Sequence, residues 1–361
     1  MRISFFIGGL SNGGAERVTC NLANYMLRAG HDVTIVTMAD DEPTYNIEEG
    51  IQRVTLLEST ERRSFVINSL RRLRRFHNYL RGSNTEVYVV MLPVTTIMLL
   101  GMKRFTKAKI IAAERSYPAI YSSRIQYMLR SLARKADGWV FQTPGQKEWY
   151  SSSGIQNDII IPNAINPAFI RPQFTGDRKK RIVTVGSLTK PKNHELLINA
   201  FSAISKEFPD YKLVIFGEGS KRDILHNLVK ELGVEKQVDL PGYSSNITDD
   251  IIDSTLYVLS SDYEGMPNSL LEAMALGLPC ISTDCDGGGA RLLIENEVNG
   301  LLVPKGDEIA LGIAMRRLLT DTDLAVKCSK NARAVCEKFS PDVIYSEWEN
   351  YIKNIIRKEK V

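Results

Sequence analysis

The chain has 361 residues, of which 43% are hydrophobic and 24% charged, and its formal net charge is +4. This length and ordinary composition predict a soluble globular protein of about two domains and argue against disordered, collagen-like and disulfide-rich classes. Residues 1–175 hold 22 basic and 14 acidic side chains, a net +8, whereas residues 176–361 hold 24 and 28, a net −4. The basic half predicts an anionic partner.

Apolar strand-length runs alternate with amphipathic helix-length runs along the first half. The predicted strands are 3–7, 33–37, 87–91, 110–113, 139–142 and 159–161, and the predicted helices are 15–29, 64–81, 120–135 and 145–152. Continuous apolar strands separated by helices predict a parallel sheet that is covered on both faces. Residues 1–170 are therefore expected to form a doubly wound, Rossmann-like α/β domain.

A proline-rich stretch interrupts this pattern and predicts a linker at 171–180. The alternation then restarts, with strands at 182–185, 212–216, 238–240, 256–259, 280–283 and 301–303 and helices at 192–206, 220–232, 268–276, 307–319 and 323–338. Residues 181–340 are thus expected to form a second doubly wound domain. Residues 341–361 predict a C-terminal amphipathic helix without indicating its packing partner. With two such domains, we expect the ligand in a cleft across which they face each other.

Signals for metals and for membrane spans are weak. The five cysteines form no C-x-x-C pair and the four histidines are scattered, so we expect no metal site and a reducing compartment. The apolar start of the chain is too short for a signal peptide. The longest apolar run, 87–102, is interrupted and falls short of the roughly 20 residues that a membrane span needs.

The most informative segment follows the predicted strand 256–259 and runs from Ser260 to Gly277. Gly265 and Pro267 enforce a loop, and Asn268 is placed to cap the next helix. Glu264 would then lie in the loop and Glu272 in the second helical turn, several ångströms apart on one ligand face. Carboxylates suit vicinal hydroxyls, and the free N–H groups at the helix start suit phosphate. The alternative is an ordinary solvated helix face.

This segment resembles the signature of retaining glycosyltransferases of the GT-B fold, family 4, which reads Glu-Gly-x-Pro-x-x-x-x-Glu-Ala-x-Ala-x-Gly-x-Pro. The matching residues are Glu264, Gly265, Pro267, Glu272, Ala273, Ala275, Gly277 and Pro279. The resemblance implies that Glu264 contacts the donor sugar and that Glu272 binds the ribose hydroxyls of the nucleotide. Met266, Asn268 and Ser269 would belong to the same donor site.

Three other loops extend the resemblance in the second half. The run from Gly186 to Asn193 resembles the family loop Gly-Arg-Leu-x-x-x-Lys-Asn, whose Arg and Lys grip the donor diphosphate. Lys192 matches the lysine, but Ser187 replaces the arginine, so either Lys190 substitutes or the diphosphate is held differently. A further turn with Gly217 and Gly219 would face the donor. Tyr243 lies where the family places the nucleobase.

The first half contributes two cleft segments on the acceptor side. Gly13, Gly14 and Glu16 follow the first strand and resemble a family loop that opens a helix, and they do not form the dinucleotide fingerprint. Glu114 and Arg115 follow the strand 110–113, where many relatives carry a histidine that touches the donor sugar. Glu114 and Arg115 have a plain alternative as structural polar groups.

Residues 62–81 contain seven arginines and no acidic residue, and their apolar positions recur at helical spacing. A basic amphipathic helix of this kind suits an anionic membrane surface, with Arg71, Arg72, Arg74, Arg75 and Phe76 as the candidate contacts. The alternative is a core-packed helix with a solvated basic face. No nucleic-acid motif accompanies the charge, so we expect no nucleic-acid partner.

The resemblance implies a retaining hexosyltransferase. Its donor would be a nucleotide diphosphate sugar, most simply a UDP sugar carrying a hexose or an N-acetylhexosamine, and its acceptor a growing glycan linked to polyprenyl diphosphate. The catalytic candidates are Glu264, Lys192 and Arg115, with no metal or other cofactor. The pathway would be exopolysaccharide, capsule or O-antigen synthesis at the cytoplasmic face of the inner membrane. One alternative is a nucleotide-sugar epimerase. The other is a non-catalytic partner subunit, and the departures at Ser187 and Arg115 keep this second alternative open.

Overall fold

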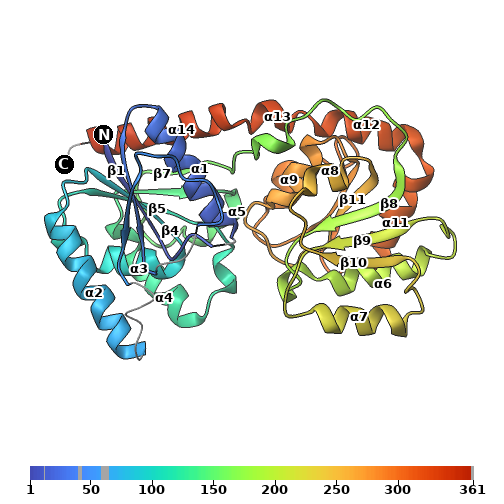
Figure 1. Ribbon diagram of the computed structural model, residues 1–361, viewed down its shortest axis with the longest axis horizontal. Helices are drawn as coiled ribbons and strands as arrows, with labels where there is room; N and C mark the ends of the chain where they lie inside the picture. Colours follow the sequence, from blue (N-terminus) through green and yellow to red (C-terminus); the bar gives the residue numbers. More distant parts are fainter. Residues whose placement is uncertain (12, 40–42, 58–64, 359–361) are drawn as a thin grey trace. The chain divides into compact units, whose positions relative to one another are not determined.

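The computed structural model describes residues 1–11, 13–39, 43–57 and 65–358 and divides into two compact units (Figure 1). Unit 1 comprises Met1–Asn163 together with Ile344–Val361, and unit 2 comprises Ala164–Val343. Each unit is a parallel sheet covered by helices, and most of its successive strands are connected through a helix.

Unit 1 contains a parallel sheet in the order β3-β2-β1-β4-β5-β6-β7. The strands are β1 (Arg2–Ile7), β2 (Asp32–Thr37), β3 (Gln52–Thr55), β4 (Val87–Met91), β5 (Lys109–Ala113), β6 (Gly138–Phe141) and β7 (Asp158–Ile160). The strand order reverses between β1 and β4. Open α/β sheets bind ligands beyond the carboxyl ends of their strands at such a switch point, so this edge is where functional side chains are expected.

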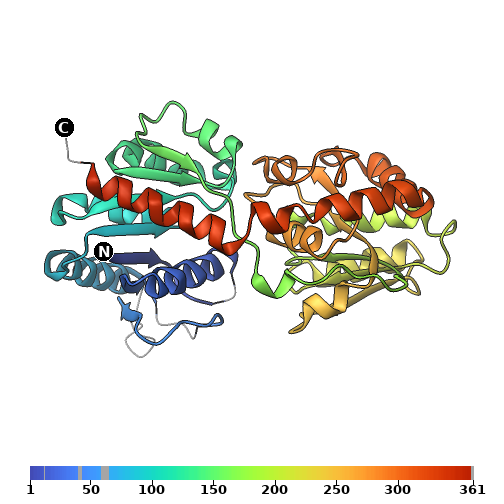
Figure 2. The same cartoon turned by 90° about the horizontal axis from the view of Figure 1, so that it is seen from above.

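Helices cover both faces of this sheet. They are α1 (Gly14–Arg28), α2 (Phe65–Gly82), α3 (Pro93–Gly101), α4 (Ser123–Leu132), α5 (Pro144–Trp149) and α14 (Pro341–Arg357). On one face, α2, α3 and α4 pack over a core that includes Phe6, Tyr88 and Trp139 (Figure 1). On the other face α1 and α14 lie side by side (Figure 2), and the rings of Tyr25 and Tyr345 are 5.3 Å apart.

The C-terminal helix α14, whose partner the sequence left open, packs on unit 1. Its Trp348 and Ile352 are buried. The Tyr351 hydroxyl donates hydrogen bonds to the backbone oxygens of Trp139, at 3.3 Å, and of Asn157. A Cβ added at Gly138 would lie 2.2 Å from that hydroxyl oxygen, so a glycine lets the helix approach the start of β6.

Phe76 was predicted to face a membrane, and the structure corrects this. Its side chain is fully buried and stacks on Phe6, with ring centroids 4.4 Å apart. Leu80, one turn later, is also buried. The apolar face of α2 is therefore divided, because its last turns cover the sheet whereas Leu70 and Leu73 in its earlier turns are 62% and 44% exposed. Arg62 and Arg63 lie outside the described residues.

Two of the arginines on α2 are occupied within unit 1. The Arg72 Nε donates to the Met38 backbone oxygen at 3.0 Å, and the Arg75 Nη1 donates to the Leu56 backbone oxygen at 3.3 Å. Both guanidinium groups therefore hold the helix against the sheet edge. Within the part of the chain that the structure describes, no helix is long and apolar enough to span a bilayer.

Unit 2 contains a parallel sheet in the order β10-β9-β8-β11-β12-β13. The strands are β8 (Lys179–Val185), β9 (Lys212–Phe216), β10 (Val238–Gly242), β11 (Ser254–Leu259), β12 (Cys280–Asp284) and β13 (Leu301–Pro304). The order reverses between β8 and β11. These two strands are neighbours in the sheet although β9 and β10 separate them in the chain.

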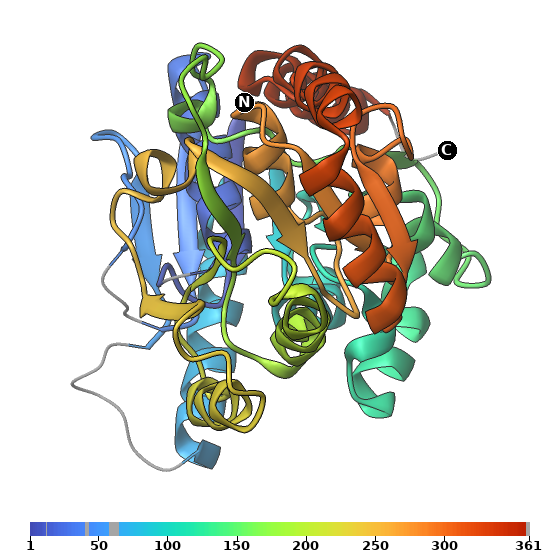
Figure 3. The same ribbon diagram turned by 90° about the vertical axis from the view of Figure 1, so that its right-hand side faces the viewer.

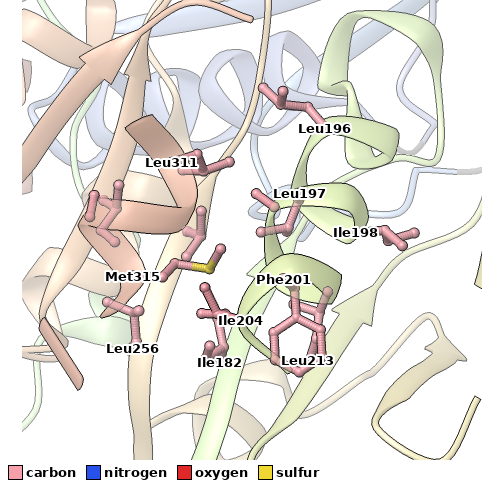
Figure 4. Close-up of a cluster of buried hydrophobic side chains, with 14 of the residues drawn as sticks. Ile182, Leu196, Leu197, Ile198, Phe201, Ile204, Leu213, Leu256, Leu311 and Met315 are labelled. Atoms are coloured by element: carbon pink, nitrogen blue, oxygen red, sulfur yellow. The ribbon is translucent and has the colours of Figure 1, made fainter. Parts of the chain in front are cut away.

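The helices of unit 2 also lie on both faces of its sheet (Figure 3). They are α6 (His194–Ile204), α7 (Arg222–Glu231), α8 (Ile247–Ile251), α9 (Asn268–Ala275), α10 (Gly289–Leu293), α11 (Glu308–Thr320), α12 (Thr322–Ala332) and α13 (Val335–Lys338). Figure 4 shows the core between α6, α11 and the sheet, where Phe201, Leu256 and Met315 meet. On the opposite face, the Tyr257 hydroxyl donates to the Ser269 Oγ of α9 at 2.8 Å.

The boundary between the units lies after Asn163, earlier than the linker predicted at 171–180. The intervening chain is attached to unit 2. The Ile165 N–H donates to the Phe339 oxygen at 2.9 Å, Phe169 is buried, and the Arg333 guanidinium donates to the Arg171 oxygen at 2.8 Å. The prolines therefore punctuate a segment that packs, and β8 begins at Lys179.

Candidate active site

Lys192 and Glu264 meet at the carboxyl edge of the unit 2 sheet. Lys192 follows β8 and Glu264 follows β11, and because these parallel strands are neighbours, their loops emerge side by side. The Lys192 Nζ lies 2.5 Å from the Glu264 Oε1, and the Ser261 Oγ donates to the same oxygen at 2.8 Å. The two side chains are 23% and 12% exposed, so the pair is shielded but reachable.

The same two loops are tied together through Asn193. Its backbone is left-handed, with φ 45°, and its side-chain oxygen caps α6 by accepting from the Leu196 N–H. Its amide nitrogen donates to the Asp262 carboxylate at 3.0 Å. The Ser260 hydroxyl also donates to the Lys192 backbone oxygen at 3.0 Å. These hydrogen bonds fix the backbone at Lys192 and so position its side chain, which is the kind of preorganisation that an electrostatic site requires.

Glycines allow the neighbouring loops to pack against these two. A Cβ at Gly217, where φ is 141°, would lie 2.0 Å from the Gly186 oxygen, and one at Gly219 would lie 2.4 Å from the Leu188 oxygen. A Cβ at Gly289 would lie 1.9 Å from the Gly265 oxygen. Side chains at these positions would force the backbone apart, so the glycines set the spacing of the loops.

Helix α9 carries Glu272 in its second turn, where the side chain is buried. Asn268 was predicted to cap this helix. Instead it is the first helical residue, and the cap position is Pro267, whose side chain makes no capping hydrogen bond. The helix therefore begins one residue earlier than a cap at Asn268 would place it, with an extended backbone at Pro267. Met266 is buried beside this start.

His194 completes this edge, and the sequence prediction missed it. It is 2% exposed, and its Nε2 lies 3.2 Å from the Ser187 oxygen of the β8 loop. Burial, with a smaller contribution from nearby Lys192, lowers the pKa of His194 to about 4. The ring is therefore neutral at physiological pH, and its Nε2–H donates to the Ser187 backbone oxygen. The sequence signal that could have identified His194 is its position directly after Lys192 and Asn193.

The remaining predicted residues of this edge are exposed. The Ser187 Oγ lies 3.1 Å from the Thr189 Oγ1, and Lys190 lies on the surface of the same loop. Tyr243 follows β10, two strands away from β8, and is 78% exposed. The structure thus brings Gly186, Lys192, Glu264 and their glycine neighbours into contact and leaves Tyr243 at the far side of the sheet.

In unit 1, Glu114 lies directly after β5 in a dense hydrogen-bond network. One carboxylate oxygen accepts from the Tyr121 hydroxyl at 2.7 Å and from the N–H groups of Arg115 and Ser116, and the other accepts from the Tyr150 hydroxyl at 2.9 Å. Burial raises the pKa of Glu114, and these hydrogen bonds oppose that shift. The carboxylate fixes the turn that presents Arg115.

The Arg115 guanidinium is held on one side only. Its Nη2 donates to the Asn163 Oδ1 at 2.9 Å, and Asn163 also accepts from Gln142 at 2.7 Å. Its Nε and Nη1 are shielded and have no hydrogen-bond partner among the described residues. Burial lowers the pKa of Arg115 to about 10, which leaves the group charged at neutral pH. The ends of β5, β6 and β7 thus converge on one cation.

The glycine-rich loop after β1 begins α1. Gly13 is the cap residue, and Gly14 begins the helix. A Cβ at Gly13 would lie 1.9 Å from the Glu16 Oε2, so the Glu16 carboxylate folds back over the helix start. Burial raises the pKa of Glu16. An acidic side chain over these N–H groups matches the positive end of the helix dipole.

Comparison with known proteins assigns these arrangements to a family. A model described as Glycosyl transferases group 1 matches residues 167–335, and a model described as Glycosyltransferase Family 4 matches residues 12–169. The chain is a family 4-like glycosyltransferase of the GT-B fold. Its two parallel sheets with their covering helices are the two Rossmann-like domains of that fold.

Several relatives match this glycosyltransferase over nearly its whole length. One from Campylobacter jejuni, named GalNAc-α-(1→4)-GalNAc-α-(1→3)-diNAcBac-PP-undecaprenol α-1,4-N-acetyl-D-galactosaminyltransferase, is 28% identical over 98% of this chain and 99% of the relative. An uncharacterized glycosyltransferase from Haemophilus influenzae is 26% identical over 97% and 99%. The crystal structure of Anabaena Alr3699/HepE in complex with UDP has a TM-score of 0.82 at 16% identity and covers 98% of this chain and 100% of that one.

The described residues of the glycosyltransferase contain no group of three or more His, Cys, Asp or Glu side chains arranged to hold a metal ion. The cysteines of this part of the chain are free thiols, and all but the half-buried Cys336 are buried. Burial raises the pKa of the Cys285 thiol, which lies behind the Glu264 loop, to about 12. That thiol is therefore protonated at neutral pH.

Proposed function

We propose that this glycosyltransferase moves a hexose or N-acetylhexosamine from a UDP sugar to a growing glycan with retention of anomeric configuration. The observation that carries the proposal is the Lys192–Glu264 pair at the β8/β11 edge, with buried Glu272 on the adjoining helix. This arrangement offers one cation to a diphosphate and two carboxylates to hydroxyl groups. Glu264 would contact the donor sugar and Glu272 the ribose.

In the proposed reaction, the bond between the sugar C1 and the diphosphate oxygen breaks while the acceptor hydroxyl oxygen bonds to C1 from the same face. The acceptor proton passes to the departing phosphate oxygen. Lys192 and the backbone N–H groups at 265–269 would stabilise the charge that develops on the diphosphate, in a step that needs no metal. Arg115 of unit 1 is the third catalytic candidate, because its Nε and Nη1 have no partner in the described structure.

We further propose a glycan acceptor linked to polyprenyl diphosphate and a role in exopolysaccharide, capsule or O-antigen synthesis. The name of the Campylobacter relative specifies an undecaprenol-diphosphate acceptor and an α linkage, and another relative from Erwinia amylovora is named for amylovoran biosynthesis. An α product formed from an α-linked nucleotide sugar requires retention. The protein would then work at the cytoplasmic face of the inner membrane.

The test separates transfer from nucleotide binding. Lys192→Ala and Glu272→Ala are assayed for sugar transfer and, by calorimetry, for UDP binding, because both residues are assigned to the nucleotide end of the donor. Each variant should lose at least about tenfold in kcat/KM, and Glu272→Ala should weaken UDP binding by about 1.5 to 3 kcal/mol, since a hydrogen bond to a charged group is removed.

Lys180→Ala and Glu231→Ala are the matched controls, because both side chains are exposed and lie away from the carboxyl edge. Undiminished transfer in Lys192→Ala and Glu272→Ala would exclude the assignment.

UDP release only in the presence of acceptor distinguishes transfer from epimerisation, and tight UDP binding without turnover would indicate a non-catalytic subunit. Activity that persists with a chelator supports the metal-free step, and loss that added metal restores contradicts it.

A further inference from the structure

Unit 1 contains a polar cavity, open to the surface and lined mostly by exposed side chains, that the proposed reaction does not use. It has a volume of about 680 Å³ and lies between α4 and the turn that follows α5. Four serines, a glutamine, a tyrosine and two arginines, Arg130 and Arg134, line it. The volume is within the range of roughly 300 to 1,000 Å³ that is typical of small-molecule sites.

All the side chains that line the cavity can donate hydrogen bonds. Every one of these side chains carries an N–H or O–H group, and none is a carboxylate. The surrounding sequence agrees, because residues 115–136 contain five basic residues and no Asp or Glu. A cavity that presents hydrogen-bond donors and two permanent positive charges selects a ligand rich in acceptor oxygens and negative charge.

Arg130 is fixed in place before any ligand arrives. Its guanidinium carbon stacks 3.9 Å from the centroid of the Trp149 ring, and its Nη2 donates to the Trp149 oxygen at 3.2 Å. The stack orients the planar group, so little side-chain entropy remains to be lost when its other N–H groups bind an oxyanion.

Ser153 is a second sign of an unfilled site. It is 9% exposed, and its hydroxyl is shielded and has no hydrogen-bond partner among the described residues. A shielded hydroxyl without a partner costs free energy that a bound acceptor oxygen would recover. Tyr127 lines the same cavity and is 74% exposed, which offers a face for the carbon skeleton of a polyol.

We propose that this cavity is an oxyanion site that binds a phosphate group carried on a hydroxylated molecule. Arg130 and Arg134 would pair with the phosphate charge, and the serine hydroxyls would donate hydrogen bonds to the oxygens of the ligand. A soluble phosphorylated polyol and the phosphoglycerol headgroup of an anionic lipid share this chemistry. The site goes beyond the proposed transfer reaction and does not rest on it, because its residues belong to unit 1 and none is assigned to the nucleotide sugar.

The experiment uses the full chain and two probes: sn-glycerol 1-phosphate followed by phosphorus NMR, and vesicles of phosphatidylglycerol or phosphatidylcholine followed by co-sedimentation. The double variant R130Q/R134Q should weaken binding about tenfold or more, since it removes both cations that would form charge-assisted hydrogen bonds to the phosphate. The matched control R124Q/K135Q removes the same charge from exposed positions at the two ends of the same helical segment that do not line the cavity. It should change binding by less than about threefold, as surface charges do.

Binding of glycerol phosphate identifies a soluble ligand, and binding of phosphatidylglycerol vesicles alone identifies a headgroup. Either result supports the site when R130Q/R134Q weakens that binding about tenfold or more. No binding of either probe by the wild type overturns the proposal. Equal losses in the two double variants overturn it as well, because they indicate only general surface charge. R134Q alone, which leaves the Arg130 contacts with Trp149 in place, guards against misfolding and should still weaken binding several-fold.

Discussion

The buried ring of His194, which contacts the β8 loop, makes the free energy of unfolding depend on pH. Its folded pKa of about 4 lies below the unfolded value of 6.5, because burial disfavours the charged form. As pH falls below 6.5, the unfolded chain takes up a proton that the folded chain does not. The free energy of unfolding should therefore decrease between pH 6.5 and pH 4 by up to about 3 kcal/mol and change little from this source below that range.

The measurement is urea unfolding of unit 2 at pH 7, 5.5 and 4.5 for the wild type and for His194→Gln. The glutamine keeps a donor for the Ser187 oxygen and cannot titrate. The wild type should lose more stability on acidification than the variant does, since the other titrating groups are common to both proteins. Parallel pH dependences in the two proteins would contradict the prediction.

Adjacent glycines in the β12 loop make a matched pair at the same site. In Gly289→Ala the new Cβ would meet the Gly265 oxygen at 1.9 Å, so the Glu264 loop must move. Gly288→Ala meets no atom nearer than 3.9 Å and adds only the strain of a φ of 75°, about 1 kcal/mol. We expect Gly289→Ala to lower kcat/KM by tenfold or more and Gly288→Ala to lower it by less than about threefold, as measured by transfer assays.

At the scale of elements, α14 contributes to unit 1 from the far end of the chain. Trp348 is 1% exposed, and truncating a buried tryptophan typically costs 3 to 5 kcal/mol. Trp348→Ala should therefore lower the midpoint of the unfolding transition of unit 1 in a denaturant titration. Asn350→Ala, an exposed position on the same helix, should leave that midpoint unchanged. If both variants unfold alike, the packing of α14 is not a stabilising contact.

The elements also show what periodicity predicts and what it leaves open. The spacing of Leu70, Leu73, Phe76 and Leu80 correctly indicated a helix, now α2. It could not indicate which turns the sheet covers, because a helical repeat contains no information about its neighbour. The apolar run 87–102 likewise divides into β4 and α3, and Pro93 at the start of the helix marks the change. The short β3 has a weak pattern and was not predicted.

At the scale of the whole molecule, the two doubly wound domains were predictable because continuous apolar strands alternate with helices in both halves. The resemblance to the family signature and to the family loop at 186–193 singled out Glu264, Glu272 and Lys192 as candidates, and their roles remain predictions. The Lys192–Glu264 contact itself depends on the adjacency of β8 and β11, which two intervening strands hide in the sequence. The Asn193–Asp262 hydrogen bond depends on the same adjacency. The contacts of Ser261 and His194 are local to their own loops, but single residues of these types carry too little signal to be selected.

The excess positive charge of the first half leads to the last prediction. On α2, Leu70 and Leu73 are exposed and Arg74 is an exposed cation, whereas Arg72 and Arg75 hold the helix to the sheet. If this surface binds an anionic membrane, L70S/L73S/R74E should weaken binding to phosphatidylglycerol vesicles by more than tenfold. Each basic residue near such a surface contributes about 1 kcal/mol and the leucines add buried apolar area.

The matched control I309S/I313S/K330E changes two exposed isoleucines and one exposed lysine of unit 2, the acidic half, and should bind vesicles as the wild type does. Co-sedimentation at two salt concentrations measures both variants, and the wild type should lose affinity as salt screens the arginines. Equal vesicle binding by the α2 variant and the wild type would show that the exposed face of α2 is a solvated surface. The excess charge of unit 1 would then have to be assigned to the acceptor or to the cavity beside α4.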